Sequence, residues 1–333
     1  MIMRLYLTGY FDRNFGDDMM MKLVVRSLPE VTFLVEDTVD TPILSEPNVE
    51  QADYKECRRF PKLIVTGSGF MINTKEAFQS ALRQFLRGRS PGDYCLGCNM
   101  EPLSDPIKQF LIRKKMNKFK LITCRDQASY RWLRRNTRKP QVHCLPDILF
   151  SIPEEFIPQR DDPQMLGIVL MHRSGDSETC AYYRAMAEAA DEWVQSTGKG
   201  VILMAFDAGK EDDLFACRAV REQMQFSEKA QIVSHWDGTE IPAAFAQCEK
   251  IIGARFHSMV LALRMGIAFF PVIFREKIRN LILDLNYPVS GCDIRQIDQQ
   301  AISDFLKADF LPQEKYSVTN QHVQLLRAAI NED

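Results

Sequence analysis

The chain has 333 residues, of which 46% are hydrophobic and 26% charged, a composition typical of a globular protein with room for two domains. A formal net charge of −2 argues against a general nucleic-acid partner, and no apolar run approaches the roughly 20 residues of a membrane span. Nine scattered cysteines and the absence of a signal-peptide pattern predict a reducing, cytoplasmic location.

Short apolar runs alternate with amphipathic stretches along the whole chain. The expected strands are 5–8, 32–35, 63–66, 119–124, 166–171, 201–206, 231–234, 250–253 and 268–274. The expected helices are 17–27, 75–87, 105–117, 127–135, 178–196, 212–225, 240–247, 257–265 and 276–285. Because such alternation builds parallel sheets covered by helices, we expect an α/β protein with two Rossmann-like domains facing each other across a cleft.

The domain boundary is expected in the stretch 151–164, "SIPEEFIPQRDDPQ", which is rich in proline and acidic residues. The predicted domains are an N-terminal one over 1–155 and a C-terminal one over 164–310, followed by a terminal helix within 311–333.

The first half of the chain has two glycine-containing strand ends. In "LTGYFDRNFGDD" the strand ends at Gly9, and a loop through Asn14 and Gly16 leads to a helix near Asp17. Asp17 is compatible with the helix dipole, so one interpretation is an acid that caps the helix. In the other, Asn14 and Asp17 contact sugar hydroxyls or orient a catalytic group. The second strand end carries Gly67-Ser68-Gly69, which permits a close approach of a ligand to the backbone but is equally consistent with a tight turn.

Two further features of this half have ordinary structural interpretations. Arg125 and Asp126 end a strand, where they either line the cleft or form a structural ion pair, the interpretation that we favour. Cys95 and Cys98 form a CxxC pair without a second pair of metal ligands, which favours core or loop cysteines over a zinc site.

The second half places basic residues at two strand ends. His172 and Arg173 follow a strand in "GIVLMHRSGDS". In "KIIGARFHSMVLALRMG", Arg255, Phe256 and His257 form the turn between a strand and a helix. Free amide groups, a guanidinium and an imidazole together predict a site for a phosphate or carboxylate. In the alternative interpretation, Arg255 pairs with a neighbouring acid and His257 caps its own helix.

The order of these stretches, "GYFDRNFGDD", "VTGSGF", "CRDQAS", "LPD" and "IIGARFHSMVLALRMGIAFFPVIFREK", resembles the polysaccharide pyruvyl transferase family over about residues 5–285. Members are similar to GT-B glycosyltransferases in fold. They transfer a pyruvyl unit from phosphoenolpyruvate to sugar hydroxyls of surface glycans or exopolysaccharides, generally as a ketal. The chain departs from the family's glycine pattern at Gly67-Ser68-Gly69 and at 95–103, "CLGCNMEPL", which concerns the acceptor side.

The resemblance implies roles for residues on both sides of the reaction. Phosphoenolpyruvate would be held by a basic and aromatic set: Arg255, Phe256, His257, Arg173 and Lys277. His257 and His172 are the candidate general acids, whereas the base is either Asp17 or Asp126. The acceptor would lie against the N-terminal domain and these residues: Asn14, Gly16, Gly67, Ser68, Gly69, Arg125 and Asp126. No metal or cofactor besides phosphoenolpyruvate as co-substrate is expected.

The expected acceptor is a sugar or a lipid-linked oligosaccharide. Peripheral contact with the inner membrane would come from the terminal helix or from Phe110–Lys120, "FLIRKKMNKFK", although this run is also typical of a solvated helix face. Two alternatives remain open. One is a GT-B glycosyltransferase that uses a nucleotide sugar, with Glu276 near the donor ribose, and the other is a non-catalytic relative.

Overall fold

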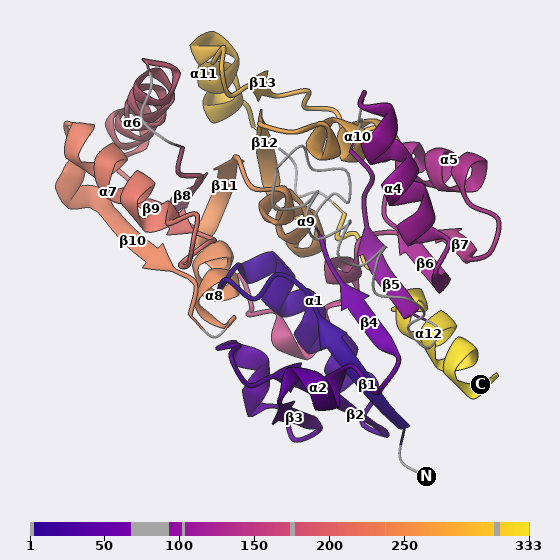
Figure 1. Ribbon diagram of the computed structural model, residues 1–333. Helices are drawn as coiled ribbons and strands as arrows, with labels where there is room; N and C mark the ends of the chain where they lie inside the picture. The colour runs from indigo at the N-terminus through magenta and orange to yellow at the C-terminus, as the bar shows by residue number, and fades with distance from the viewer. Residues whose placement is uncertain are drawn as a thin grey trace. The chain divides into compact units, whose positions relative to one another are not determined.

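The computed structural model describes residues 3–67, 93–101, 104–173, 177–236, 238–309 and 314–332 (Figure 1). The chain forms two compact units. Unit 1 comprises Met1–Phe11, Asp17–Ile148 and Thr319–Asp333, and unit 2 comprises Asp12–Gly16 and Leu149–Val318. Residues 12–16, which precede and begin the first helix, therefore belong with the second half of the chain.

Unit 1 is a seven-stranded sheet with the order β3-β2-β1-β4-β5-β6-β7, in which every neighbouring pair is parallel. Its strands are β1 (Met3–Thr8), β2 (Val31–Glu36), β3 (Val49–Ala52), β4 (Lys62–Val65), β5 (Asp93–Cys98), β6 (Phe119–Cys124) and β7 (Gln141–Cys144). Its helices are α1 (Phe15–Arg26), α2 (Tyr54–Cys57), α4 (Pro106–Met116), α5 (Gln127–Asn136) and α12 (Gln321–Asn331), with a 3-10 turn η1 (Pro42–Ser45).

Unit 2 is a six-stranded parallel sheet with the order β10-β9-β8-β11-β12-β13. Its strands are β8 (Met165–Leu170), β9 (Val201–Ala205), β10 (Ala230–Ser234), β11 (Cys248–Gly253), β12 (Ala268–Ile273) and β13 (Cys292–Asp293). Its helices are α6 (Ser177–Thr197), α7 (Asp213–Gln223), α8 (Glu240–Ala246), α9 (Phe256–Met265), α10 (Glu276–Asp284) and α11 (Gln299–Lys307). Short 3-10 turns complete the chain: η2 (Ile148–Ser151), η3 (Glu154–Phe156) and η4 (Ser227–Lys229).

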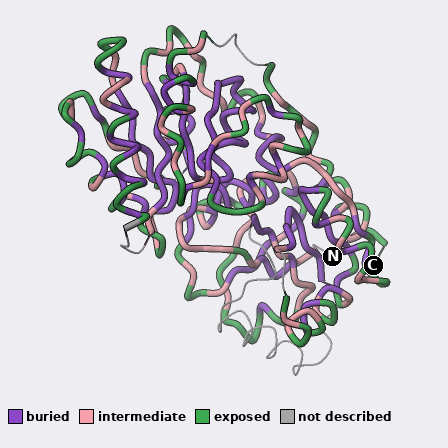
Figure 2. Tube along the Cα trace, turned by 90° about the horizontal axis from the view of Figure 1, so that it is seen from above, coloured by how far each residue is buried: buried purple, intermediate pink, exposed green. Residues whose placement is uncertain are grey.

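The core of each unit lies along its sheet, where Figure 2 shows buried residues following the strands and exposed residues on the outer helices and turns. The central strands β5, β9 and β12 are buried along their whole length, and so is helix α9. Because strands covered on both faces carry apolar side chains in both directions, they form continuous apolar runs rather than alternating ones. Helix α9 ends at Gly266, whose left-handed backbone (φ 67°) suits glycine.

The predicted α/β class with two parallel sheets is confirmed, and each of the nine predicted strands corresponds to an observed one. Strands β3, β5, β7 and β13 were not among the predicted strands. The segment that resembled an altered glycine region, 95–103, begins within β5, in which Gly97 (φ 74°) lies at a register shift between Cys95 and Cys98. The helix predicted over 75–87 lies outside the described residues.

Candidate active site

The carboxyl ends of β8 and β11 meet at the point where the strand order of unit 2 reverses. In open parallel sheets this point is the usual place for a ligand, because the loops on either side diverge there. His172 and Arg173 follow β8, whereas Arg255 follows β11. Two of the predicted basic stretches are therefore brought to the same edge of one sheet.

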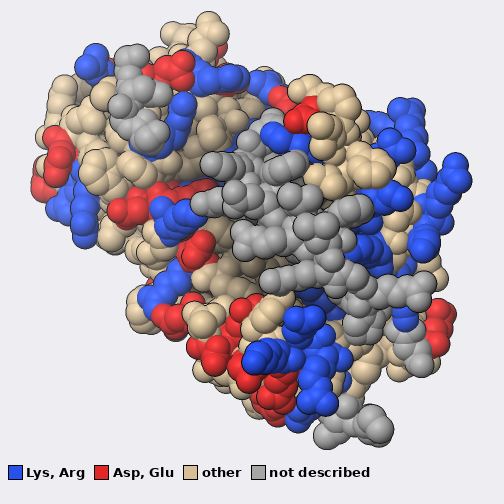
Figure 3. All heavy atoms as spheres, in the orientation of Figure 1, with Lys and Arg blue, Asp and Glu red and all other residues tan. Residues whose placement is uncertain are grey.

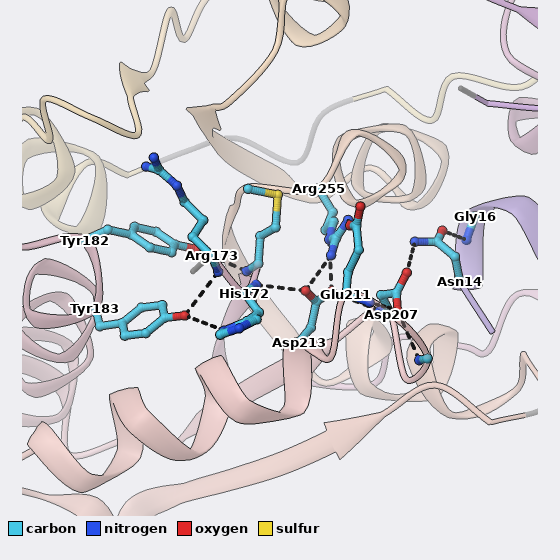
Figure 4. A network of polar contacts seen from close by, with 12 residues as sticks. Asn14, Gly16, His172, Arg173, Tyr182, Tyr183, Asp207, Glu211, Asp213 and Arg255 are labelled. Atoms are coloured by element: carbon cyan, nitrogen blue, oxygen red, sulfur yellow. Dashed lines mark hydrogen bonds and ion pairs between the residues drawn. The ribbon is translucent and has the colours of Figure 1, made fainter. Parts of the chain in front are cut away.

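Asp213, the first residue of α7, joins three of the loops at this edge (Figure 4). Its fully buried carboxylate accepts the backbone N–H groups of His172 and Asp207, each at 2.9 Å. It also accepts Nε of Arg255 at 2.9 Å, and Nη2 of the same guanidinium. Burial raises the pKa of Asp213, and the charge of Arg255 opposes this rise. Asp213 thereby fixes the loops after β8, β9 and β11 to one another.

Arg255 occupies the N-cap position of α9, where it makes no side-chain cap, and its guanidinium lies between two carboxylates. Nε and Nη2 donate to Asp213, and Nη1 donates to Glu211. Burial disfavours the charged form, but the two carboxylates outweigh burial and raise the pKa of Arg255. Pairing of Arg255 with neighbouring acids, which was one of the two interpretations of this turn, is thus what the structure shows.

The carboxylate of Glu211 lies among the basic side chains of the site. Burial alone would raise its pKa, but the charges of Arg255, Lys277 and Arg275 lower it. Its side chain remains 46% exposed. Lys277 also lies near the turn of α9, with Nζ 5.5 Å from the centre of the Phe256 ring. The predicted anion site is therefore a cluster of cations that already surrounds one partly exposed anion.

The Arg173 side chain points away from the Asp213 network in Figure 4. One terminal nitrogen, Nη2, donates to Glu178 at 3.3 Å, and the guanidinium lies 5.7 Å from the centre of the Phe274 ring. The other, Nη1, is buried and has no hydrogen-bond partner within the described ranges of the chain. A buried donor of this kind is well placed to bind an anionic oxygen.

His172 is held by a tyrosine from α6. The Tyr183 hydroxyl lies 3.1 Å from Nδ1 of His172 and accepts the backbone N–H of Arg173 at 3.4 Å. Since that hydroxyl accepts from Arg173, its own proton can be donated to His172. The imidazole also packs edge-on against Phe215, with ring centres 4.9 Å apart. These contacts orient a partly exposed imidazole next to the Arg173 backbone.

His257 lies in the first turn of α9, directly against the loop of residues 12–16. A Cβ atom on Gly16 would lie 1.6 Å from Nδ1 of His257, so any larger side chain there would displace the imidazole. Asn14 secures this loop: its Oδ1 accepts the Gly16 N–H at 3.1 Å, and its Nδ2 donates to Asp207 at 3.3 Å. The predicted residues Asn14, Gly16 and His257 are thus neighbours.

The predicted residues of unit 1 form a separate network within that unit. Asp17 accepts the Gly67 N–H at 3.0 Å. Arg125 and Asp147 are both buried and form an ion pair of 2.7 Å, and Arg125 also donates to the Gly67 carbonyl. This favours the structural interpretation of Arg125.

Asp126 caps α5 by accepting the backbone N–H of Ser129 at 2.7 Å and its hydroxyl at 2.6 Å. Ser68 and Gly69 lie outside the described residues. Cys95 and Cys98 belong to a core cluster of unit 1, as predicted for core cysteines.

Four residues of the site were not predicted from the sequence: Tyr183, Asp207, Glu211 and Asp213. The three acids lie in "FDAGKEDD", which runs from the residue after strand β9 to the first residue of helix α7. Acids clustered at the carboxyl end of a predicted strand were the available signal. Within the described part of the chain, no helix is long and apolar enough to cross a membrane, and no group of three or more His, Cys, Asp or Glu side chains is placed to hold a metal ion.

Solved structures with this fold include UDP-GlcNAc 2-epimerases. The enzyme from Methanocaldococcus jannaschii, in complex with UDP-GlcNAc and UDP, has a TM-score of 0.67 at 10% identity, over 99% of this chain and 100% of that one. A putative UDP-N-acetylglucosamine 2-epimerase from Listeria monocytogenes has a TM-score of 0.63 at 10% identity, over 99% and 96%. MurG from Acinetobacter baumannii has a TM-score of 0.50 at 11% identity, over 99% and 100%. These similarities confirm the GT-B-like fold class.

The sequence comparisons identify the family. No curated protein sequence matches the chain significantly. The sequence model of the family described as polysaccharide pyruvyl transferase matches residues 14–273, which include Asn14, His172, Asp213 and Arg255. Because this match covers well over half of the chain, the protein belongs to the polysaccharide pyruvyl transferase family.

Proposed function

We propose that the protein transfers the pyruvyl group of phosphoenolpyruvate to two hydroxyls of a sugar in a surface polysaccharide or its lipid-linked precursor, forming a ketal. The observation that carries the proposal is that Arg173, Arg255 and His257 all follow the two strands at the switch point of unit 2, in a chain of this family. Phosphoenolpyruvate carries a phosphate and a carboxylate on the same carbon, so it needs cations for two anionic groups.

The cations of the site come from three neighbouring strand ends. Arg173 follows β8, Arg255 follows β11, and Lys277 lies in the first turn of α10 after β12. Guanidinium groups bind carboxylates and phosphates through paired N–H donors, which suits a ligand with two anionic groups. Phosphoenolpyruvate would engage the buried Nη1 of Arg173 as well as Arg255.

Glu211 must move away from Arg255 before this guanidinium can bind an anionic group of the donor. Its carboxylate occupies the place of a ligand anion among Arg255, Lys277 and Arg275, and it is exposed enough to leave. Asp213, in contrast, is fully buried and would keep the guanidinium oriented. In our proposal an anionic group of phosphoenolpyruvate replaces Glu211 on Nη1 of Arg255.

The chemistry balances without a metal or a further cofactor. A general acid protonates the methylene carbon of phosphoenolpyruvate, which becomes a methyl group and leaves an oxocarbenium-like carbon. One sugar hydroxyl attacks that carbon and loses its proton. The C–O bond to phosphate then breaks, and a second hydroxyl closes the ring. Of the two protons released by the hydroxyls, one replaces the proton used on the methyl group and one leaves with phosphate.

The proposed acids are His257 and His172, because an imidazole is the side chain that most often transfers protons in catalysis and both rings are positioned by neighbours. Arginine contacts would stabilise the charge that develops on the departing phosphate. The proposed base is Asp17 or Asp126, each of which already accepts a backbone N–H, from Gly67 and Ser129 respectively. The acceptor side is proposed to include Asn14, Gly16 and Gly67.

Calorimetry tests the donor directly and needs no knowledge of the acceptor. We expect phosphoenolpyruvate to bind the wild-type protein and Arg255→Ala to lose this binding, because a hydrogen bond to a charged group contributes about 1.5–3 kcal/mol. Arg221→Ala, which removes an exposed arginine from the last turn of α7, is the matched control. Binding of UDP-GlcNAc or GDP-mannose without binding of phosphoenolpyruvate would contradict the proposal.

That outcome would support the competing function, a glycosyltransferase with a nucleotide-sugar donor. One neighbour in fold is described as a complex with UDP-GlcNAc and UDP, which favours testing it. Glu276, the candidate contact to a donor ribose, is exposed in the first turn of α10 and pairs with Arg279 at 3.5 Å. A non-catalytic relative would bind neither class of donor.

A further inference from the structure

Positive charge is concentrated in one segment of unit 1. Residues 104–140 contain twelve Lys and Arg but only two Asp, a formal charge of +10 in a chain whose total is −2. The remaining residues therefore carry a formal charge of −12. The overall composition does not reveal this separation of charge, because the net charge of the whole chain is close to zero.

The fold gathers this segment on one side of a sheet. The crossovers β5-α4-β6 and β6-α5-β7 run in the same direction along the strand order, so right-handed connections place α4 and α5 on the same face. Residues of both helices pack into one core cluster with β5, β6 and β7. The two helix ends are also joined, because Oδ1 of Asn117 accepts the backbone N–H of Arg138 at 2.9 Å.

We call this surface the basic face. Its exposed cations come from α4, α5 and the turns that follow them: Arg113, Lys114, Lys118, Arg131, Arg134, Arg135, Arg138 and Lys139. The two acids of the segment, Asp105 and Asp126, are both used as helix N-caps. In Figure 3 the blue side chains gather over α4 and α5, at the upper right, with few red ones among them.

Two large apolar side chains lie exposed on the same face. Ile107 is 67% exposed and Phe110 is 48% exposed, one turn apart on α4. Lys114, a further turn along, has its Nζ 5.5 Å from the centre of the Phe110 ring. The opposite side of α4 already fills the core with Leu111, Ile112 and Met116. The exposed pair is therefore additional to the side chains that hold the helix in the fold.

We propose that the basic face docks the protein on a bilayer of anionic phospholipids, with the cations on the headgroups and Ile107 and Phe110 in the boundary with the acyl chains. A helix that combines lysine and arginine with exposed apolar side chains is the arrangement that binds such an interface. Each basic residue near an anionic bilayer adds to binding, and eight lie on this face. The inference goes beyond the proposed reaction and does not rest on it.

The apolar pair distinguishes a bilayer from a soluble polyanion. A phosphorylated or acidic polymer would neutralise the cations equally well, but it offers an aliphatic side chain such as Ile107 no apolar environment. Only the bilayer uses both kinds of side chain. The two contributions can therefore be removed separately in an experiment.

The test is co-sedimentation of the full chain with vesicles, without phosphoenolpyruvate or acceptor. We expect binding to vesicles of phosphatidylcholine mixed with phosphatidylglycerol, little binding to phosphatidylcholine alone, and loss of binding as salt is raised. The quadruple variant R131Q/R134Q/R135Q/R138Q should bind the mixed vesicles roughly 10²–10³-fold more weakly. The variant I107S/F110S should bind roughly tenfold more weakly.

Each variant has a matched control elsewhere in the chain. R184Q/R218Q/R221Q/K229Q removes the same charge from exposed positions of unit 2. F156S/L283S removes two apolar side chains that are 47% and 71% exposed. Both controls should bind vesicles as the wild type does, and circular dichroism should show all variants folded.

Three results would overturn the proposal. The first is a wild-type protein that does not bind the mixed vesicles. The second is a charge control that loses as much binding as the α5 variant, which would show that only net charge matters. The third is wild-type vesicle binding by I107S/F110S, which would show that Ile107 and Phe110 do not enter the bilayer and that charge alone holds the protein there.

Discussion

In unit 2, His257 packs so closely against Gly16 that position 16 has no room for a side chain. The imidazole fills the space where a Cβ of residue 16 would lie, and Asn14 fixes the loop through its bonds to Gly16 and Asp207. A proposed general acid contributes only if it is held near the reacting carbon. Gly16 thus has a role in positioning His257 that its lack of a side chain makes possible.

Replacement of Gly16 tests this positioning role. Gly16→Ala should displace the imidazole and lower kcat/KM nearly as much as His257→Ala, by roughly 10²-fold or more, because a positioned general acid typically supplies 10²–10⁴-fold. The measurement is steady-state release of phosphate from phosphoenolpyruvate in the presence of acceptor, with thermal melting to confirm folding. Wild-type kcat/KM in Gly16→Ala would show that the position of His257 does not matter.

Replacement of Glu211 is expected to strengthen a function of the site, the binding of the donor, instead of weakening it. If its carboxylate competes with the donor for Arg255, Glu211→Gln should tighten the binding of phosphoenolpyruvate by roughly two- to fivefold, the usual range for a partly exposed ion pair. Glu249→Gln breaks a comparable ion pair, to Lys199 at 2.7 Å, and should leave the affinity unchanged. Weaker binding in Glu211→Gln, measured by calorimetry, would mean that Glu211 supports Arg255 instead of competing with the donor.

The sequence located the basic half of this site but not its acidic half. Arg255 and His257 stand out because basic residues at a helix N-terminus oppose the helix dipole. Asp213 does not, because an acid in the first turn of a helix is favourable by itself. Its partners, Arg255 and His172, are 42 and 41 residues away in sequence, so only the fold reveals the contact.

At the scale of elements, the strands that were predicted carry apolar runs, and all of them except the edge strand β10 lie in the interior of a sheet. β13 has only two residues, too few for a detectable hydrophobic pattern. β5 contains cysteines and a glycine, which made it hard to recognise as a strand in the sequence. Gly97 is required in β5, because a Cβ there would lie 2.6 Å from the Met20 methyl group, and its φ is 74°. A glycine that indicates a loop in sequence therefore serves here as an irregularity within a strand.

Helix α12 returns from the end of the chain to pack on β5 and β6 of unit 1, and His322 holds it there. Nε2 of this buried imidazole lies 2.7 Å from the Pro146 carbonyl, to which it donates. Nδ1 lies 2.7 Å from the hydroxyl of Thr123, which itself accepts the Gly97 N–H. A neutral imidazole with its proton on Nε2 satisfies this arrangement, because Nδ1 can then accept the proton of the Thr123 hydroxyl.

The pH dependence of stability should report this contact. Burial lowers the pKa of His322, while the Pro146 carbonyl and Asp147 oppose the shift and Arg125 reinforces it. The unfolded chain therefore binds the proton more readily, so the free energy of unfolding should fall as the pH drops below the unfolded value of about 6.5. Urea unfolding between neutral and mildly acidic pH should show this loss in the wild type and a smaller one in His322→Gln. Equal slopes in the two proteins would exclude His322 as the cause.

At the scale of the whole molecule, the two units repeat one topology and differ in what lies at the carboxyl edge. Both sheets reverse strand order once, between β1 and β4 in unit 1 and between β8 and β11 in unit 2. In unit 1 this edge is occupied by the ion pair of Arg125 and Asp147, both deeply buried. The edge of unit 2 carries partly exposed cations, which favours unit 2 as the place of the proposed anionic donor.

We propose that phosphoenolpyruvate binds at this edge of unit 2, and a crystal structure with the donor bound would decide the question. We expect its anionic groups on Arg255 and Arg173, with Glu211 turned away and Asp213 still bonded to Arg255. Phosphoenolpyruvate bound elsewhere in the chain, or no bound donor in crystals that take up a nucleotide sugar at Arg255, would contradict the proposal.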